Sequence, residues 1–317
     1  MRGIETQKSK LLGVIVFVVV TLLAPYVLYP VFLMKVMCFG LFACAFNLLL
    51  GYLGLLSFGH AAFLGSASYI TAYSVQTLGL TPGLGILAGT ASAAFLGLVI
   101  GWLAIRRSGI YFAMITLGLA QVVYFLSLQL NFTGGEDGIQ GVPRGILFGV
   151  VDLTSTMNMY YFVLAIFLFG LWVLNRAINS PFGQILKSIR ENEPRAISLG
   201  YNVNRYKLLA FIISATLSGL AGSTKSLVFQ LASLTDVHWH MSGEVVLMTL
   251  LGGMGTVFGP VVGALLVITL NNYLAGFGSW VTVITGGIFV ICVLSFRRGI
   301  VGEILALKRS QSDNTTK

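Results

Sequence analysis

Residues 180–207 read SPFGQILKSIRENEPRAISLGYNVNRYK, a polar and basic segment between two stretches that are almost wholly apolar. A helix is predicted from Phe182 to about Asn192, because Ile185 and Ile189 lie one helical turn apart within it. The charged residues Lys187 and Arg190 lie on other faces of this helix, which we expect to face water. Such a segment is typical of a surface that a partner in the aqueous phase binds.

The same segment predicts a second, shorter helix. Pro194 disfavours helical geometry at Glu193, which ends the first helix, but proline is well tolerated at the first position of a new one. Glu193 suits the positive end of the new helix dipole, and Gly200 is a natural C-terminal stop. We therefore expect a short helix from Pro194 to Leu199 at the tip of a loop.

The composition of the whole chain indicates a membrane protein. Hydrophobic residues make up 56% of the 317 and charged residues 9%, and the mean hydropathy is +0.91. Soluble domains carry roughly 25% charged residues. The fold class we predict is all-α: a single polytopic transmembrane domain over residues 1–317, with residues 180–207 as a cytoplasmic loop within it.

The net charge of +9 reflects membrane topology and not nucleic-acid binding. Sixteen of the nineteen Lys and Arg residues fall in five places: the N-terminus, Arg106–Arg107, the stretch 176–207, Arg297–Arg298 and the C-terminal tail. Basic clusters at the ends of apolar spans follow the positive-inside rule. The loop 131–158 carries Glu136, Asp137 and Asp152 instead, and it is expected on the outer side.

About ten transmembrane helices are predicted, since a span needs about 20 apolar residues. Ten spans place every basic cluster and both termini on the cytoplasmic side. The first is interpreted as a retained span and not as a cleaved signal peptide, because the segment shows no clear small-x-small cleavage site. The one at 241–257 is short enough to be a half-helix. The candidates are 11–29, 31–50, 57–78, 83–104, 110–130, 159–175, 208–230, 241–257, 261–276 and 279–296.

Two glycine-rich stretches of the chain have similar sequences. Residues 49–54 read LLGYLG and are followed by Phe58-Gly59, while residues 250–255 read LLGGMG and are followed by Phe258-Gly259. Glycine clusters in apolar segments indicate either close helix packing or interrupted helices. The second alternative predicts two broken helices that meet near the membrane midplane, where their free backbone groups line a polar pathway.

Polar residues inside the apolar spans are candidates for that pathway, because such residues are costly there. Singly, each is also explained as a helix–helix hydrogen-bonding residue. Glu244 is either a pathway carboxylate or a helix-dipole partner at the interface, and Lys225 either pairs with it or reaches water at the outer end of its span. The pathway candidates are Asn47, Ser57, His60, Tyr111, Thr116, Glu244, Gly252 and Gly255.

Catalytic and metal-binding signatures are missing from the sequence. It contains no G-x-x-x-x-G-K-[ST] motif for nucleotide phosphates, no G-x-S-x-G and no H-E-x-x-H. His238 and His240 have no carboxylates at ligand spacing and are interpreted as part of an interfacial aromatic anchor. We expect no enzyme activity, no metal and no cofactor, and any energy has to come from a partner or an ion gradient.

Four blocks of this sequence resemble the branched-chain amino acid ABC transporter permeases, of the M-type. They lie in the order that the family has and run through most of the chain, the last two being the most specific. Lys225 departs from the family, which usually has an uncharged residue there. The blocks are FNLLLGYLGLLSFGHAAFLGSASY (46–69), GIYFAMITLGLAQVV (109–123) with FTGGEDGI (132–139), SPFGQILKSIRENEPRAISLGYNVNRYKLLAF (180–211) and SGEVVLMTLLGGMGTVFGPVVGALL (242–266).

The resemblance implies a permease subunit of a bacterial inner-membrane importer for branched-chain or related hydrophobic amino acids. Its partners would be a second homologous permease, two cytoplasmic ATPases that bind the ATP, and a periplasmic solute-binding protein. Glu193 and Arg195 would contact an ATPase and not the helix bundle. The residues that match the coupling loop of the family are Arg190, Glu191, Asn192, Glu193, Pro194, Arg195 and Gly200.

Three alternatives remain open. Urea and short-chain amide permeases belong to the same wider family, so the solute is less certain than the family. An ion-coupled secondary transporter would also have ten spans, but it needs intramembrane carboxylates, of which Glu244 is the one candidate, and it leaves the loop 180–207 unexplained. A purely structural subunit explains the loop but not the polar, glycine-rich interior.

Overall fold

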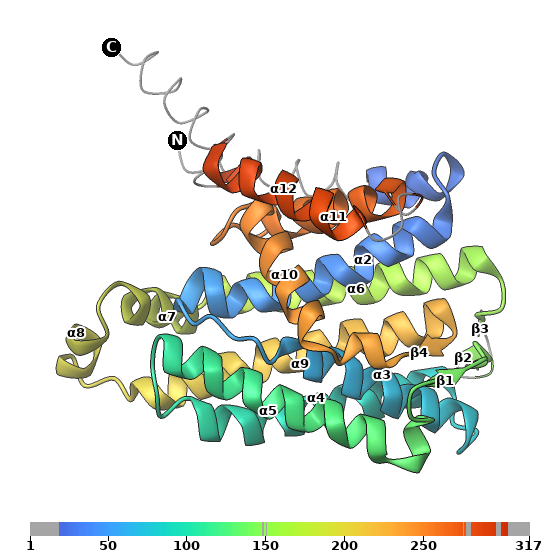
Figure 1. The fold of residues 1–317 in the computed structure, drawn as a ribbon, viewed down its shortest axis with the longest axis horizontal. Coiled ribbons are helices and arrows are strands. Elements are labelled where there is room, and N and C mark those ends of the chain that lie inside the picture. The colour runs from blue at the N-terminus through green and yellow to red at the C-terminus, as the bar shows by residue number, and fades with distance from the viewer. Residues whose placement is uncertain are drawn as a thin grey trace, which may run out of the picture.

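The computed structural model describes residues 19–147, 149, 151–274, 276, 280–295 and 299–303. Its elements are almost all helical (Figure 1), as the sequence predicts. In chain order they are η1 (Ala24–Tyr26), α2 (Pro30–Asn47), η2 (Leu48–Leu53), α3 (His60–Gln76), α4 (Pro82–Ala104), α5 (Ile110–Gln129), η3 (Asn131–Thr133), β1 (Ile139–Gln140), β2 (Ile146–Leu147), β3 (Val151–Asp152), α6 (Thr156–Asn179), α7 (Pro181–Glu191), α8 (Glu193–Ser198), α9 (Val203–Phe229), β4 (Leu231–Ala232), η4 (Leu234–Asp236), α10 (Trp239–Gly252), α11 (Gly259–Leu274) and α12 (Trp280–Ser295).

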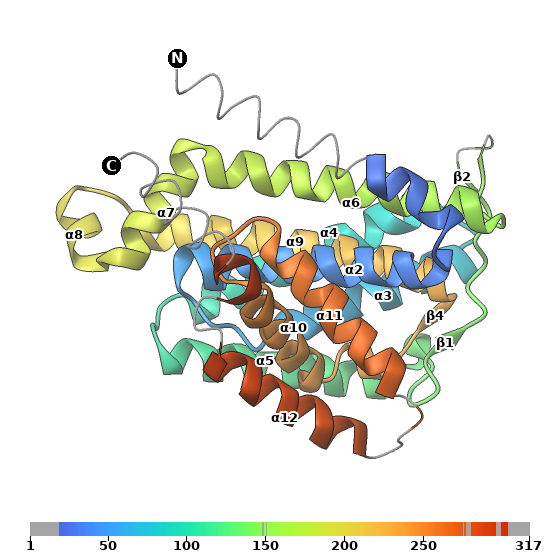
Figure 2. The same cartoon turned by 90° about the horizontal axis from the view of Figure 1, so that it is seen from above.

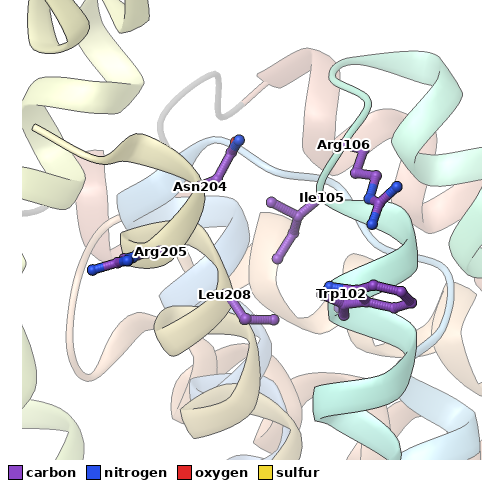
Figure 3. A pocket seen from close by; sticks show the side chains of 7 residues that line it. Trp102, Ile105, Arg106, Asn204, Arg205 and Leu208 are labelled. Carbon is purple, nitrogen blue, oxygen red and sulfur yellow. The ribbon is translucent and has the colours of Figure 1, made fainter.

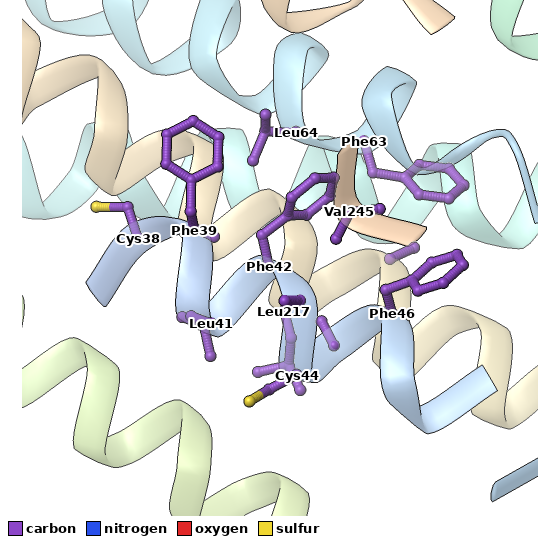
Figure 4. Packing of buried hydrophobic residues seen from close by; sticks show 14 of the residues in the cluster. Cys38, Phe39, Leu41, Phe42, Cys44, Phe46, Phe63, Leu64, Leu217 and Val245 are labelled. Carbon is purple, nitrogen blue, oxygen red and sulfur yellow. The ribbon is translucent and has the colours of Figure 1, made fainter. Parts of the chain in front are cut away.

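Helix α2 forms the centre of the bundle. Its sequence is apolar on every face, which is typical of a helix that is surrounded by others. It packs against α6, α9, α10 and α11. Figure 4 shows Phe42 and Phe46 of α2 beside Leu64 and Phe63 of α3, with Val245 of α10 next to them. This aromatic core fixes the positions of the helices that carry the candidate site.

Helices α3, α4 and α9 pack closely through small residues. A Cβ atom added at Gly219 of α9 would lie 2.2 Å from the Ala93 Cβ atom of α4, and one added at Gly222 would lie 2.0 Å from the Leu64 carbonyl oxygen of α3. Small residues at such contacts let helix backbones approach, which is how membrane helices gain packing energy. The three helices therefore form a tight unit beside α2.

The two ends of the bundle differ in charge and structure (Figure 1). One end carries α7, α8 and the turn between α4 and α5, and the other carries two short antiparallel two-stranded sheets, β1 with β4 and β2 with β3. At the α8 end lie Arg106, Arg107, Arg176, Lys187, Arg190, Arg195, Arg205 and Lys207. The β-strand end carries the acidic residues Glu136, Asp137 and Asp152, as the charge pattern predicts.

The described helices follow most of the predicted spans. Five segments are long and apolar enough to cross a membrane: Pro30–Leu53, Pro82–Ala104, Ile110–Gln129, Thr156–Asn179 and Val203–Phe229. The shorter α3, α10, α11 and α12 account for the remaining predicted spans from residue 57 onward, and Figure 2 shows α12 at the edge of the bundle, beyond α10 and α11. Most of the predicted span 11–29 lies outside the described residues.

Helix α10 is longer than the half-helix that the sequence suggests. It begins at Trp239, five residues before Glu244, and its 14 residues extend over about 21 Å at about 1.5 Å per residue. That length is still short of a hydrocarbon core of about 30 Å. Figure 1 shows α10 running across the direction of α2, between α3 and α11.

Candidate functional site

Helix α7 begins the loop 180–207 and packs against the bundle. Ser180 is extended and Pro181 occupies the first turn, so the chain leaves α6 and starts a new helix. Leu186 and Ile189 are buried, and Ile185 is half-buried. The predicted helix is confirmed, and its apolar face holds the loop against the ends of α6, α9 and η2.

Helix α8 forms the tip of the loop, and its predicted existence is confirmed. The Asn192 side chain accepts a hydrogen bond from the Arg195 N–H at 3.0 Å and caps the N-terminus. At the other end Gly200 has a φ of +86°, and its N–H donates to the Ile197 carbonyl while the Tyr201 N–H donates to the Ala196 carbonyl. This is a Schellman motif, which glycine favours. Both ends of α8 are therefore fixed by local hydrogen bonds.

An ion pair joins α8 to α9 and corrects one expectation. The Glu193 carboxylate lies 2.6 Å from the Lys207 Nζ atom, and the Lys207 side chain is only 4% exposed. Glu193 thus contacts the bundle, although the sequence suggested that it contacts an ATPase. The physical reason is that a buried ammonium needs a counter-charge, and Glu193 supplies it from fourteen residues away.

The outward face of α8 remains open. Pro194 and Arg195 are exposed, as are the apolar side chains of Ile197 (58%) and Leu199 (67%). The Arg195 side chain forms no ion pair with any carboxylate in the described part of the chain. Two exposed aliphatic residues on a capped helix at the charged end of the bundle make a surface suited to a protein partner.

Arg190 joins α7 to the first glycine-rich stretch. Its guanidinium donates a hydrogen bond to the Gly51 carbonyl of η2, and its Cγ atom would lie 3.0 Å from a Cβ atom on Gly54. Lys187 lies over the Tyr52 ring at 5.7 Å. Around these contacts is a cavity of about 430 Å³, lined by Gly51, Tyr52, Lys187, Arg190, Glu191 and Gly255.

Asn47 joins the two glycine-rich stretches. Its amide donates to the Thr256 carbonyl at 2.8 Å and accepts from the Gly255 N–H at 3.0 Å. A Cβ atom on Gly51 would lie 2.6 Å from the Gly255 nitrogen, so the two stretches touch. Both are helix interruptions, as one alternative predicted. They meet beside α7, at the α8 end of the bundle, whereas the sequence suggested the midplane.

The second glycine-rich stretch lets α10 and α11 pack in direct backbone contact. A Cβ atom on Gly252 would lie 1.9 Å from the Gly259 carbonyl oxygen, and one on Gly263 would lie 1.8 Å from the Met248 carbonyl oxygen. No side chain fits at either position without displacing backbone. Close packing and helix interruption, the two interpretations of the sequence, both hold here.

We predict that Gly252→Ala destabilises the protein by about 1 to 3 kcal/mol, because the methyl group overpacks this contact. Thermal unfolding in detergent measures the effect. Gly243→Ala is the matched control, since it lies on the same helix with nothing within 4 Å of its Cβ position. Equal melting temperatures for the two variants would contradict the packing.

A second group of pathway candidates lies around the start of α3. Residues 54–59 are neither helix nor strand and lead from η2 to His60, which is fully buried and hydrogen-bonds the Ser214 Oγ atom at 2.9 Å. The His60 ring contacts the rings of Phe46, Phe63 and Phe211 edge-on. In this conformation His60 makes helix–helix contacts in the core.

The hydroxyls of Thr116 and Ser57 hold the segment 54–59 in place. The Thr116 hydroxyl accepts a hydrogen bond from the Phe58 N–H at 3.2 Å, and the Ser57 hydroxyl accepts one from the Gly59 N–H at 3.2 Å. Both side chains are fully buried. They satisfy backbone groups that the break in the helix leaves free, as buried donors require.

Tyr111 and Glu244 lie apart from these groups. Tyr111 is largely exposed in the first turn of α5. Glu244 is half-buried on α10, with the His240 Nδ1 atom 3.9 Å from its carboxylate. Of the eight pathway candidates, the structure therefore gathers six into two connected groups and leaves two on other faces.

Lys225 has a partner that the sequence did not reveal. It forms an ion pair with Asp236 of η4, and not with Glu244. The chain reverses after α9 at Gln230, a residue with a φ of +54°, and this reversal returns Asp236 to the last turns of α9. A sequence signal for this turn is lacking, because the residue is neither glycine nor asparagine.

At the β-strand end, Asp152 is held in its charged form. Its carboxylate accepts hydrogen bonds from the Thr154 N–H at 2.9 Å and from the Thr154 hydroxyl. These bonds lower the pKa of Asp152 below its ordinary value, the backbone N–H having the larger effect. Asp152 therefore keeps its charge to lower pH than an aspartate without these hydrogen bonds.

The apolar spans, the helix interruptions and the charged loop together define a multi-pass α-helical membrane protein. Residues 29–294 match the family described as the branched-chain amino acid transport system / permease component, and the chain belongs to this family. No solved structure matches the chain significantly.

Three similar proteins are named for the transport of different solutes. The high-affinity branched-chain amino acid transport system permease protein LivM of Salmonella typhimurium is 30% identical over 283 residues, covering 80% of this chain and 65% of LivM. The ribose import permease protein RbsC of Bacillus subtilis is 29% identical over 195 residues, covering 57% of this chain and 58% of RbsC. The autoinducer 2 import system permease protein LsrC of Klebsiella pneumoniae is 27% identical over 239 residues, covering 70% and 65%. The chain thus spans somewhat less than two thirds of the length of these relatives.

Proposed function

We propose that this chain is a permease subunit of an ABC importer and that α8 transmits the movement of an ATPase to it. The observation that carries the proposal is the chain of contacts from α8 to the interior. Glu193 joins α8 to Lys207 at the start of α9, while Arg190 joins α7 to Gly51. Displacement of the loop would move both elements together.

The orientation follows from the charges. Basic residues gather at the α8 end and acidic residues at the β-strand end, so the α8 end is cytoplasmic by the positive-inside rule. We place the chain in a bacterial inner membrane with both termini in the cytoplasm. The exposed face of α8 then meets the aqueous phase in which ATPases operate.

The partners we propose are those that the family resemblance implies. Two cytoplasmic ATPases would bind and hydrolyse the ATP, one of them against α8, while a second homologous permease completes the pathway. A periplasmic binding protein would deliver solute at the β-strand end. Two discrete packings of the helices, switched by the loop, would alternate access to the pathway.

The solute we propose is a branched-chain or related hydrophobic amino acid. The name of the Salmonella relative supports this class, since that relative covers more of this chain than the relatives named for ribose or autoinducer 2 import. Urea or a short-chain amide is the second candidate, because the wider family that the chain resembles includes permeases for those solutes.

Purification of the tagged chain from its native membrane, with each partner identified by mass, tests the proposal. Two ATPases, a second permease and a binding protein are expected, and the ligand of the binding protein identifies the solute. Recovery of the chain alone, active in vesicles with an ion gradient, would instead establish a secondary transporter.

Arg190→Ala is expected to lower uptake by about tenfold or more. A hydrogen bond from a charged group contributes roughly 1.5 to 3 kcal/mol, and about 1.4 kcal/mol corresponds to tenfold. The assembled importer should still hydrolyse ATP, because α8 is unchanged. Uptake and ATP hydrolysis in reconstituted vesicles measure the two effects. Arg176→Ala, which removes an exposed charge at the end of α6, is the control. Equal uptake by both variants would refute the role of Arg190.

A further inference from the structure

A second cavity lies at the α8 end, between the last turn of α4 and the first turns of α9. Its volume is about 240 Å³, and it lies apart from the glycine-rich contacts described above. Figure 3 shows Ile105 and Leu208 in the gap between the two helices, with Arg106 and Arg205 on opposite sides of it. The lining residues are Gly101, Trp102, Ile105, Arg106, Asn204, Arg205 and Leu208.

The gap opens where the contact between the two helices ends. A Cβ atom on Gly97 would lie 2.4 Å from the Ala215 Cβ atom, and one on Gly101 would lie 2.8 Å from the Phe211 Cδ1 atom. Beyond Gly101 the facing residues are larger, and Ile105 and Leu208 form apolar walls. The cavity is therefore an apolar groove that continues a tight helix crossing.

Two cationic groups flank this groove without a counter-charge. The Arg106 guanidinium lies over the Trp102 ring at 4.6 Å, and neither it nor Arg205 forms an ion pair within the described part of the chain. Lys207, two residues after Arg205, is by contrast paired with the Glu193 carboxylate. The groove thus has one uncompensated guanidinium group, that of Arg106, beside its opening, and a second, that of Arg205, is directed away from the gap on the other side of α9.

The surroundings of the groove indicate lipid. Trp102 is 56% exposed, and Leu103 and Leu209, its neighbours on α4 and α9, are exposed as well. Exposed aliphatic residues on membrane helices contact acyl chains, and tryptophan is favoured at the headgroup level. An inorganic phosphate would gain nothing from these apolar walls, whereas a phospholipid would use walls and charges together.

We propose that this groove binds an anionic phospholipid. The headgroup phosphate lies at the mouth of the groove beside the Arg106 guanidinium, which matches phosphate geometry, and the exposed Arg205 on the far side of α9 adds attraction at longer range. One acyl chain follows the groove past Leu208 toward Trp102. Basic pockets between membrane helices bind anionic headgroups in this way. Because Arg205 lies in the first turn of α9, the lipid also holds the helix that follows the loop.

Native mass spectrometry of the full chain tests this. The protein is equilibrated with vesicles of phosphatidylcholine and phosphatidylglycerol, delipidated in stages, and the retained phosphatidylglycerol is measured. Arg106→Gln with Arg205→Gln should retain about thirtyfold less, which corresponds to about 1 kcal/mol for each cationic residue lost. Arg107→Gln with Arg176→Gln removes the same charge from exposed positions at the same end and should retain as much as the wild type. Equal loss in both pairs would overturn the proposal.

Two further arms separate lipid binding in the groove from charge alone. Leu208→Trp fills the groove and keeps both guanidinium groups, so it should reduce phosphatidylglycerol retention as the double variant does. Unchanged retention would show that the lipid does not enter the groove. Inorganic phosphate in excess should not displace the lipid, and displacement would identify a site for free phosphate instead.

Discussion

Asp236→Asn is expected to lower the free energy of unfolding by about 3 to 5 kcal/mol, because it leaves the Lys225 ammonium buried without a counter-charge. The Asp236 side chain is 2% exposed and that of Lys225 is 14% exposed, so water cannot replace the lost partner. The pair also joins the end of α9 to η4, directly before α10. Unfolding in mixed detergent micelles by titration with SDS measures the effect.

Two variants make this result specific. Lys225→Met with Asp236→Leu removes both charges and should recover most of the stability, since a buried ion pair is often replaced by apolar residues without loss. Glu244→Gln, on a carboxylate that is 24% exposed and whose partner His240 is 3.9 Å away, should cost less than about 1 kcal/mol. If Asp236→Asn were as stable as Glu244→Gln, the ion pair would have no part in holding η4.

The ion pair of Glu193 shows how exposure sets such magnitudes. Its carboxylate is 37% exposed, so water compensates part of the charge when the contact with Lys207 is broken. Substitution of Glu193 should therefore destabilise the protein less than substitution of Asp236. It is nevertheless no clean probe of partner binding, because it affects the fold of the loop as well.

Local signals in the sequence were sufficient for the helices and for the loop. The length of an apolar span predicts a transmembrane helix, and Pro194 and Gly200 predict where the short helix of the loop begins and ends. These signals depend on neighbouring residues, so a single sequence shows them directly. The two glycine-rich stretches were likewise visible, as either close helix contacts or breaks. What the sequence could not show was that they meet beside α7, because Asn47 and Gly255 are 208 residues apart.

The candidate site was predictable in its parts but not in its connections. Arg190 and Gly51 were assigned to different functions by the sequence, and the fold places them in contact. His60 stood out as a polar residue in an apolar span, yet three aromatic rings and Ser214 account for its burial. Long-range packing decides such outcomes, whereas residue type and spacing do not.

Ile197→Asp with Leu199→Asp is expected to weaken binding of an ATPase by about thirtyfold or more. Both side chains are exposed at the tip of the loop, where no bundle contact requires them to be apolar. Residues at the centre of a protein interface typically contribute about 2 kcal/mol or more when truncated, and 1.4 kcal/mol corresponds to tenfold. Co-purification of the ATPase with the tagged permease, and titration of the purified subunits, measure the loss.

This double variant separates docking from folding because α8 is held by other residues. Asn192, Gly200 and Glu193 make the contacts that fix the helix, and none of them is changed. Membrane insertion and thermal stability should therefore match the wild type. Ile146→Asp is the control at the β-strand end, where an equally exposed aliphatic residue faces no ATPase on the proposed orientation. Full ATPase binding by the double variant would place the docking surface elsewhere on the cytoplasmic end, and loss of binding in the control would reverse the orientation.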